Sequence, residues 1–255
     1  MRKLPALLAI AGLTAFGNPV FAQENSAPKD TTKGFYVTAG VGGGWSSSPS
    51  ASYTESGSTL GVNYLGTING TQSLGGGVAA EAGIGYDFGN NIRGEVTYVL
   101  NNFAVGSTSA SGNVALSGEV TGNIPVNVTL DASGNVSTNS VFVSGYYDIP
   151  TKSKFTPYFG AGLGWTSVSI PSMPFSAGLT VAGASVNGTG NTDSGSASAF
   201  GYLAKIGVSY AVAKPADIYV EGIYQGNTAV TITNVDVGAL NMFSARAGVR
   251  YRFGS

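Results

Sequence analysis

The segment near the C-terminus, residues 243 to 253, constrains the fold more than any other feature of the chain. It reads FSARAGVRYRF, with Phe243, Ala245, Ala247, Val249, Tyr251 and Phe253 on one parity and Ser244, Arg246, Gly248, Arg250 and Arg252 on the other. Because side chains alternate between the two faces of a β-strand, this strand has one apolar face and one polar, charged face. Such a strand is typical of a membrane β-barrel wall, which contacts hydrocarbon outside and a polar interior inside.

Four residues of the same segment have the spacing polar-x-Gly-x-x-aromatic-x-aromatic: Arg246, Gly248, Tyr251 and Phe253. The segment therefore resembles the terminal assembly signal of bacterial outer-membrane proteins, although Gly254 and Ser255 follow its last aromatic residue. The resemblance implies that the barrel-assembly machinery is a partner of this chain.

The N-terminus predicts export. Arg2 and Lys3 precede an apolar run over residues 4–16, and Val20-Phe21-Ala22 forms a small-x-small ending. This run is shorter than the ~20 residues that a spanning helix needs, so we expect a signal peptide over 1–22, cleaved after Ala22. Residues 23–33 are then expected to form a periplasmic N-terminal tail, and residues 34–255 the outer-membrane domain.

Composition narrows the class further. Charged residues make up 10% of the chain, against ~25% in ordinary soluble domains. With no apolar run after the leader long enough for a membrane helix, closed β-structure is the remaining way to cross a bilayer. The chain has no Cys, which excludes a lipoprotein and disulfides, and its nearly balanced charge makes a nucleic-acid partner unexpected.

Alternating apolar and polar runs bounded by turn residues predict eight strands. Their expected spans are 34–45, 75–88, 92–102, 139–149, 156–168, 197–210, 217–226 and 242–253. The connections between them alternate between short and long, as in a barrel with tight periplasmic turns and extended outer loops. We therefore predict an all-β fold: a closed eight-stranded antiparallel up-and-down transmembrane β-barrel.

The charged residues of these strands fall on the parity opposite to the apolar residues. Because buried charges are stable only when they are paired, we expect an ion network in the barrel interior formed by Glu81, Glu95, Lys205, Glu221 and Arg246. Antiparallel pairing about the Gly89-Asn90-Asn91 turn also predicts an ion pair between Asp87 and Arg93 at the periplasmic rim. Glu81 and Glu95 could be considered as an acid/base couple, but a structural role is expected for them. The lumen should then be plugged.

Aromatic residues gather at both ends of the expected strands, with smaller apolar residues between them. We expect two aromatic belts, one at each membrane interface, as transmembrane barrels have. Their predicted members are Phe35, Phe88 and Tyr251 at the turn end, and Trp45, Trp165, Tyr224 and Phe243 at the loop end.

The long connections, residues 46–74, 103–138, 169–196 and 227–241, carry no Lys or Arg. Their acidic residues are Glu55, Glu119, Asp131, Asp193 and Asp236. Every basic residue after the leader lies instead in the N-terminal tail, in a short turn or in a strand, which indicates that the two ends of the barrel face different compartments.

Segments such as YFGAGLGW (158–165), SVFVSGYYDIP (140–150), FGYLAKIGVSY (200–210) and RAGVRYRF (246–253) resemble the eight-stranded outer-membrane barrels of the OmpA-like, opacity-protein and surface-antigen group. The resemblance covers most of the chain after the leader. It implies a surface-exposed barrel in the outer membrane of a Gram-negative-type bacterium, in contact with outer-membrane lipid, with roles in adhesion, immune exposure or envelope integrity.

Catalysis has little support in the sequence. Without His and Cys, the chain lacks His-based triads, thiol nucleophiles and the commonest transition-metal ligands, so we expect no catalytic residues, no metal and no cofactor. We expect a non-enzymatic, monomeric surface protein that meets a host or environmental ligand through its loops. Two alternatives stay open, a small passive porin-like channel and a soluble exported lipocalin-like binding barrel.

Overall fold

A computed structural model describes residues 33–59, 62–118, 121–181, 184–232 and 235–253. The expected signal peptide, the cleavage site after Ala22, most of the N-terminal tail, and Glu119, Gly254 and Ser255 lie outside these residues. In the part of the chain described, no helix is long and apolar enough to cross a membrane.

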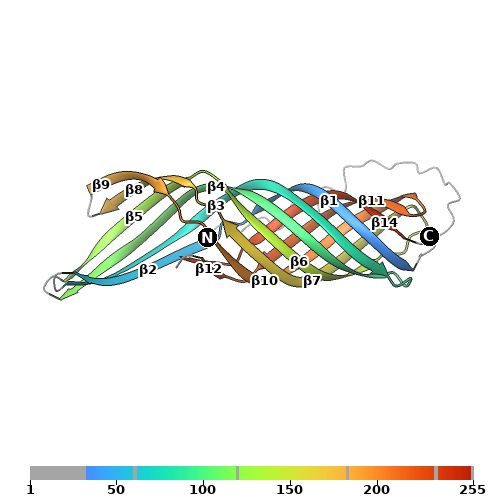
Figure 1. Cartoon of the computed structure of the whole chain (residues 1–255), viewed down its shortest axis with the longest axis horizontal. Helices are drawn as coiled ribbons and strands as arrows, with labels where there is room; N and C mark the ends of the chain where they lie inside the picture. Colours follow the sequence, from blue (N-terminus) through green and yellow to red (C-terminus); the bar gives the residue numbers. More distant parts are fainter. Residues whose placement is uncertain (1–32, 60–61, 119–120, 182–183, 233–234, 254–255) are drawn as a thin grey trace.

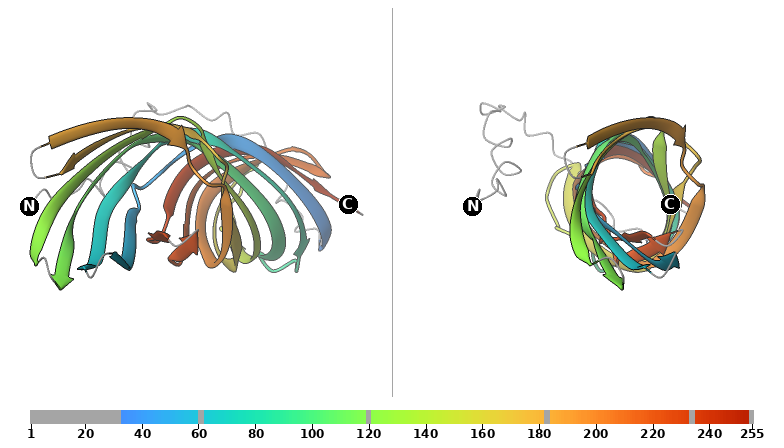
Figure 2. Two further views of the ribbon diagram at one scale, coloured as in Figure 1. Left: turned by 60° about the vertical axis from the view of Figure 1, so that its left-hand side comes forward. Right: turned by 90° about the vertical axis from the view of Figure 1, so that its left-hand side faces the viewer.

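Eight strands form the wall of an antiparallel barrel (Figure 1, Figure 2). In chain order they are β1 (Gly34–Ser46), β3 (Val62–Asp87), β4 (Ile92–Gly118), β6 (Asn135–Asp148), β7 (Phe155–Ile170), β10 (Gly195–Ala213), β11 (Ala216–Asn227) and β14 (Asn241–Arg252). Around the ring the order is β3-β1-β14-β11-β10-β7-β6-β4, and β4 pairs with β3 to close it. The predicted eight-stranded barrel is confirmed.

The closure between the first and last strands has a long, continuous register. The β1–β14 pairing runs from Tyr36 opposite Arg252 to Ser46 opposite Met242. On its other side β1 pairs with β3 from Gly34 opposite Asp87 to Trp45 opposite Gly76. Every wall strand therefore has two hydrogen-bonded neighbours and the wall leaves no open edge, which is what a lipid environment requires of a β-structure.

Among the described residues of the long connections, which the sequence patterns presented only as polar loops, six further strands are present. They are β2 (Ser50–Thr59), β5 (Gly122–Ala132), β8 (Pro174–Val181), β9 (Ala184–Asn191), β12 (Val230–Ile232) and β13 (Val235–Val237). Strands β3 and β4 continue past the barrel and stay paired as far as Val62 opposite Gly118. The sheet therefore extends well beyond the wall, in the direction away from the short turns (Figure 1).

The change from wall to extension occurs at an irregular stretch of β3. The β3–β4 register shifts between Gln72 and Leu74 and again between Leu74 and Gly77. Extra residues on one strand bend a sheet and increase its local twist. We assign to this stretch the point where the wall passes into the hairpins.

An apolar cluster fills the interior at the hairpin end of the wall. Its buried members are Val136, Val168, Ala199, Val230, Ile232 and Leu240. Two of them, Val230 and Ile232, belong to β12, which folds back so that Thr228 N donates to Phe200 O at 3.0 Å. The connection between β11 and β14 thus contributes apolar side chains to this end of the interior.

Candidate functional site

The two faces of the wall have the polarity that the sequence predicts. Val41 and Ile206 are 66% and 70% exposed on the outer face, whereas Lys205 and Arg246 are only 4% and 2% exposed. Since neighbouring residues on one strand point to opposite faces, Lys205 and Ile206 alone define the inner and outer sides of β10.

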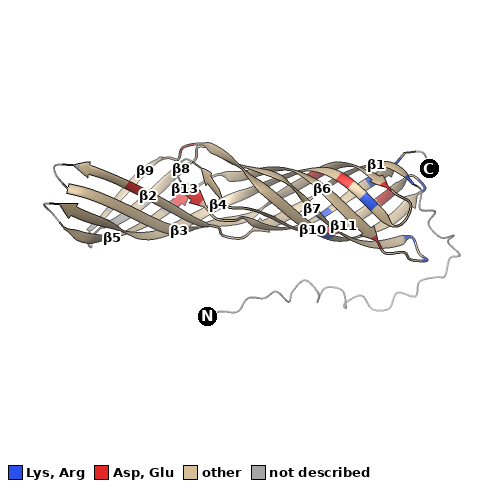
Figure 3. Ribbon diagram, turned by 90° about the horizontal axis from the view of Figure 1, so that it is seen from below, with Lys and Arg blue, Asp and Glu red and all other residues tan. Residues whose placement is uncertain are grey.

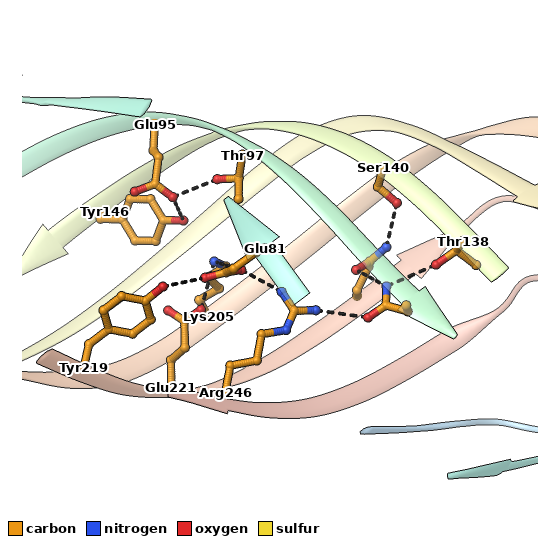
Figure 4. A network of polar contacts seen from close by, with 12 residues as sticks. Glu81, Glu95, Thr97, Thr138, Ser140, Tyr146, Lys205, Tyr219, Glu221 and Arg246 are labelled. Carbon is orange, nitrogen blue, oxygen red and sulfur yellow. Dashed lines mark hydrogen bonds and ion pairs between the residues drawn. The ribbon is translucent and has the colours of Figure 1, made fainter. Parts of the chain in front are cut away.

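The centre of the interior holds a four-residue ion network (Figure 4). Lys205 Nζ on β10 lies 2.8 Å from Glu81 Oε2 on β3 and 2.9 Å from Glu221 Oε1 on β11. Arg246 Nη1 on β14 lies 2.6 Å from the same Glu81 oxygen. Four of the five residues predicted for the network are therefore in direct contact, and all four are buried.

The fifth predicted residue, Glu95, lies beside the network and bonds to neutral groups. Its Oε1 accepts a hydrogen bond from Thr97 Oγ1 at 2.7 Å and another from Tyr146 Oη at 3.4 Å. The described ion pairs do not include it. Glu81 and Glu95 thus have different partners, and neither is arranged with the other as an acid/base couple.

A layer of uncharged polar side chains extends the network toward the hairpin end. Arg246 Nη2 donates to Asn101 Oδ1 at 3.1 Å, and Asn101 Nδ2 donates to Gln225 Oε1 at 3.3 Å. Gln225 Nε2 then donates to Ser140 Oγ at 3.0 Å. The pattern of charged residues alone does not predict this layer, although Asn101 and Gln225 have the inward parity of Glu95 and Glu221.

At the short-turn rim, the predicted ion pair between Asp87 and Arg93 is wrong, because each of the two residues has another partner. The two residues do lie opposite each other in the β3–β4 register. However, Arg93 Nη2 forms its ion pair with Asp148 Oδ1 at 2.9 Å, and Asp87 Oδ1 accepts from Gly89 N at 2.9 Å. Asp87 serves as the acceptor for a backbone N–H of its own turn. Arg93 instead pairs with Asp148, the last residue of β6, which is the other neighbour of β4.

Tyrosine rings surround the Arg93 guanidinium on the lumen side. Its Cζ lies 4.7 Å from the ring centre of Tyr146 and 5.2 Å from that of Tyr158, and its Nη1 donates to Tyr36 Oη at 3.1 Å. A cation over an aromatic face is stabilised by the ring quadrupole. A second rim cluster joins Asp217 Oδ2 to Arg252 at 2.7 Å and to Arg250 at 3.4 Å.

These side chains leave almost no free space at the level of the network. The cavity lined by Glu81, Arg93, Glu95, Lys205 and Glu221 has a volume of about 10 Å³. A single water molecule needs roughly 10–15 Å³ measured in this way. The described interior is therefore closed to a hydrated ion at this level.

The seven predicted belt residues are distributed over the outer face at two levels. At the hairpin end, Trp45 stacks with Phe243 at 6.0 Å between ring centres, and Phe243 lies 5.0 Å from Tyr224, while Trp165 is exposed on β7. At the turn end, Phe35 and Phe88 both pack against Tyr86, at 4.9 and 5.2 Å. Tyr251 packs against Phe253 at 5.4 Å.

The predicted assembly-signal residues lie on both faces of β14. Arg246 and Gly248 face the lumen, and Tyr251 and Phe253 are exposed on the outer face. The lumen-facing pair also has a role in packing, because Arg246 joins the ion network and Gly248 lies under the Tyr219 ring. Nothing in the described residues groups three or more His, Cys, Asp or Glu side chains into a potential metal site.

A closed antiparallel ring with an apolar, aromatic-banded exterior and an ion-paired interior defines an integral β-barrel protein of the bacterial outer membrane. Residues 76–249 match the surface antigen family model. The chain therefore belongs to the surface antigen family, and its location in the outer membrane is confirmed.

One similar protein is also an outer-membrane protein. Over 139 residues the chain is 32% identical to outer membrane protein PagN of Salmonella typhimurium, a match that covers 54% of this chain. The chain spans about half (51%) of the length of that relative.

Solved structures similar to this chain include Neisserial surface protein A, at 20% identity and a TM-score of 0.48, covering 86% of this chain and 97% of that one. Another is OprG of Pseudomonas aeruginosa, at 12% identity and a TM-score of 0.41, covering 90% and 100%.

Proposed function

We propose that this barrel acts as a non-enzymatic, monomeric adhesive protein of the cell surface, inserted by the barrel-assembly machinery. The observation that carries the proposal is the contrast between the two halves of the molecule. The membrane wall is filled by ion pairs and an apolar cluster, whereas the sheet extends far beyond it as paired hairpins (Figure 1). A wall with a filled interior, joined to hairpins that reach away from the membrane, is better suited to surface contact than to transport.

The orientation follows from the lengths of the connections. In outer-membrane barrels the short turns face the periplasm and the long connections face outward. The turns at 88–91, 149–154 and 214–215 are short, so the extended hairpins lie outside the cell.

The hairpins carry carboxylates as their only charged side chains. Glu55, Asp131, Asp193 and Asp236 are the acidic residues of the described part, and the long connections contain no Lys or Arg. Tyr53 Oη donates to Glu55 at 3.1 Å, which raises the pKa of that tyrosine. Such a surface repels polyanions, so we infer that it contacts uncharged or cationic surfaces.

Removal of the β8–β9 hairpin, which forms one edge of the extended sheet, tests this role. Met173 and Thr192 are bonded to each other on either side of β8 and β9, with Thr192 N donating to Met173 O at 2.8 Å. Residues 174–191 can therefore be replaced by Asn-Gly, the sequence that favours a tight hairpin turn. We expect this variant to fold normally, shown by heat-modifiable gel mobility, and to lose most of the attachment of expressing cells to surfaces coated with an uncharged or a cationic polymer.

An equal-length Gly/Ser replacement of residues 174–191 serves as the control, because it keeps the reach of the segment and removes its side chains. If cells that express the wild-type protein attach no better than cells without it, the adhesive function is refuted. If cells without the protein attach normally but become sensitive to detergent, the envelope has lost integrity, which would point to a structural role.

The passive-channel alternative is tested by conductance. Purified full-length protein in a planar bilayer should give no steady openings, because the cavity at the network is too small for a hydrated ion. A general porin added to the same bilayer verifies detection. Reproducible openings of the wild-type protein would contradict the closed interior and favour the channel.

A further inference from the structure

Three exposed lysines lie together on the periplasmic rim. Lys152 and Lys154 belong to the turn between β6 and β7, and Lys214 to the turn between β10 and β11. The turns are adjacent because β7 pairs with β10 and Ala211 N donates to Lys154 O at 3.0 Å. We call these three residues the rim lysines. In Figure 3 the basic residues of the described part of the chain lie toward this end of the molecule.

The rim lysines have no carboxylate within ion-pairing distance among the described residues. The two nearest acids in sequence, Asp148 and Asp217, are buried and engaged by Arg93 and by Arg250 with Arg252. Both acids are therefore paired with arginines of the interior. They do not neutralise the positive charge of the rim lysines, so a ligand outside the protein can do so.

Apolar side chains beside the rim lysines indicate where these lysines lie relative to the membrane surface. Ile149, Phe155 and Val212 are exposed on the outer face, and Phe155 packs against Tyr210 with ring centres 4.8 Å apart. Exposed apolar and aromatic residues mark the boundary between hydrocarbon and headgroups. The rim lysines follow directly on this boundary, and their long stems can carry the ammonium groups to the level of the lipid phosphates.

The rim lysines lie on two neighbouring turns, and the other exposed lysine of the described residues, Lys33, lies apart from them before β1, which β14 and β11 separate from β10. The remaining short turn, between β3 and β4, is Phe88-Gly89-Asn90-Asn91 and carries no charged residue. General attraction to the membrane would be served equally well by lysines spread around the ring, whereas a local group favours a ligand with concentrated negative charge.

We propose that the rim lysines form a binding site for an anionic glycerophospholipid of the periplasmic leaflet. Their ammonium groups contact the headgroup phosphate, and the apolar surface of Ile149, Phe155 and Val212 contacts the acyl chains. A lysine near an anionic lipid surface contributes enough attraction for about a five-fold change in affinity.

Lipid retention by the folded full-length protein tests the site. Protein in detergent micelles that contain equimolar phosphatidylglycerol and phosphatidylethanolamine is analysed by native mass spectrometry. We expect the wild-type protein to retain phosphatidylglycerol preferentially, each single Lys→Gln change to lower the preference about five-fold, and Lys152→Gln/Lys154→Gln/Lys214→Gln to abolish it. Adding Asn90→Lys to the triple variant returns a positive charge to the uncharged turn and should not restore the preference.

Two further measurements test whether the rim lysines bind a different negatively charged ligand, either a soluble phosphate or peptidoglycan. Glycerol phosphate at the same concentration should not displace the lipid, because it lacks acyl chains. Co-sedimentation with purified peptidoglycan should be the same for the wild-type and triple variants. The proposal is overturned if the wild-type protein shows no preference, if the triple variant keeps it, if Asn90→Lys restores it, or if only peptidoglycan binding depends on the lysines.

Discussion

Replacing Lys205 by Met is expected to lower the free energy of unfolding by roughly 3–5 kcal/mol, the cost of breaking a buried ion pair on one side. Lys205 is the cation between two carboxylates, at 2.8 Å from Glu81 and 2.9 Å from Glu221. Glu81 keeps Arg246 after the change, but Glu221 loses its cation and keeps the hydrogen bond from the Tyr158 hydroxyl, at 2.8 Å. The measurement is urea unfolding of the full-length protein refolded into lipid vesicles, followed by tryptophan fluorescence.

The control for the Lys205→Met variant is a substitution of the next residue along the strand, Ile206. Ile206→Met makes a similar side chain on the lipid face, where we expect a change within about 0.5 kcal/mol, as for surface substitutions in general. The double variant Lys205→Met/Glu221→Leu removes the unpaired carboxylate and should recover more than half of the loss, since apolar replacement of a whole buried pair is often neutral. Equal stability of the Lys205→Met and Ile206→Met proteins would show that the network does not stabilise the barrel.

The second large effect is expected from Gly248→Val. A Cβ at this position would lie 2.4 Å from Ala39 O on the neighbouring strand and 2.4 Å from Tyr219 Cζ. Overpacking of this kind typically costs about 1–3 kcal/mol. Displacing Tyr219 also breaks its hydrogen bond to Glu81, which is 3.1 Å long, so we expect a loss at the upper end of that range.

A matched glycine is available on the lipid face of the next strand. In Gly222→Val the new Cβ would have Ile206 Cγ2 as its nearest neighbour, at 3.9 Å, and should be tolerated. Refolding is performed without the assembly machinery, so a loss in vitro reports packing and not recognition of the terminal signal. If Gly248→Val refolds with wild-type stability and fails only in cells, the role of this glycine is in recognition.

Several elements of the fold could be predicted from local pattern alone. The strand over 241–252, for example, lies within one residue of the expected 242–253, and Arg246 faces inward as its parity requires. Strand extensions were harder to predict. Residues 62–74 and 103–118 are strand, but they consist largely of Gly, Ser, Thr and Asn, which are also the residues of loops, and neither of their faces is uniformly apolar.

Asp217 and Arg250 lie opposite each other and do form an ion pair, but other ion partners could not be predicted, for a different reason. Asp87 and Arg93 lie opposite each other, and so do Glu221 and Arg246, yet the ion pairs that form use other partners. Long side chains in a narrow barrel reach across the interior, so Lys205 on β10 meets Glu81 on β3 although three strands separate them around the wall. Register between neighbours carries no information about that contact.

The sequence by itself determined which side chains face lipid and which face the interior, because alternation is a property of the extended backbone and needs no partner strand. It also determined that the charges inside nearly balance, and that the outward-reaching connections are free of cations. Only the tertiary structure decided which acid binds which base, how little space is left between them, and how far the hairpins continue as sheet. Those features depend on the closure and stagger of the whole ring, which bring distant segments to one level.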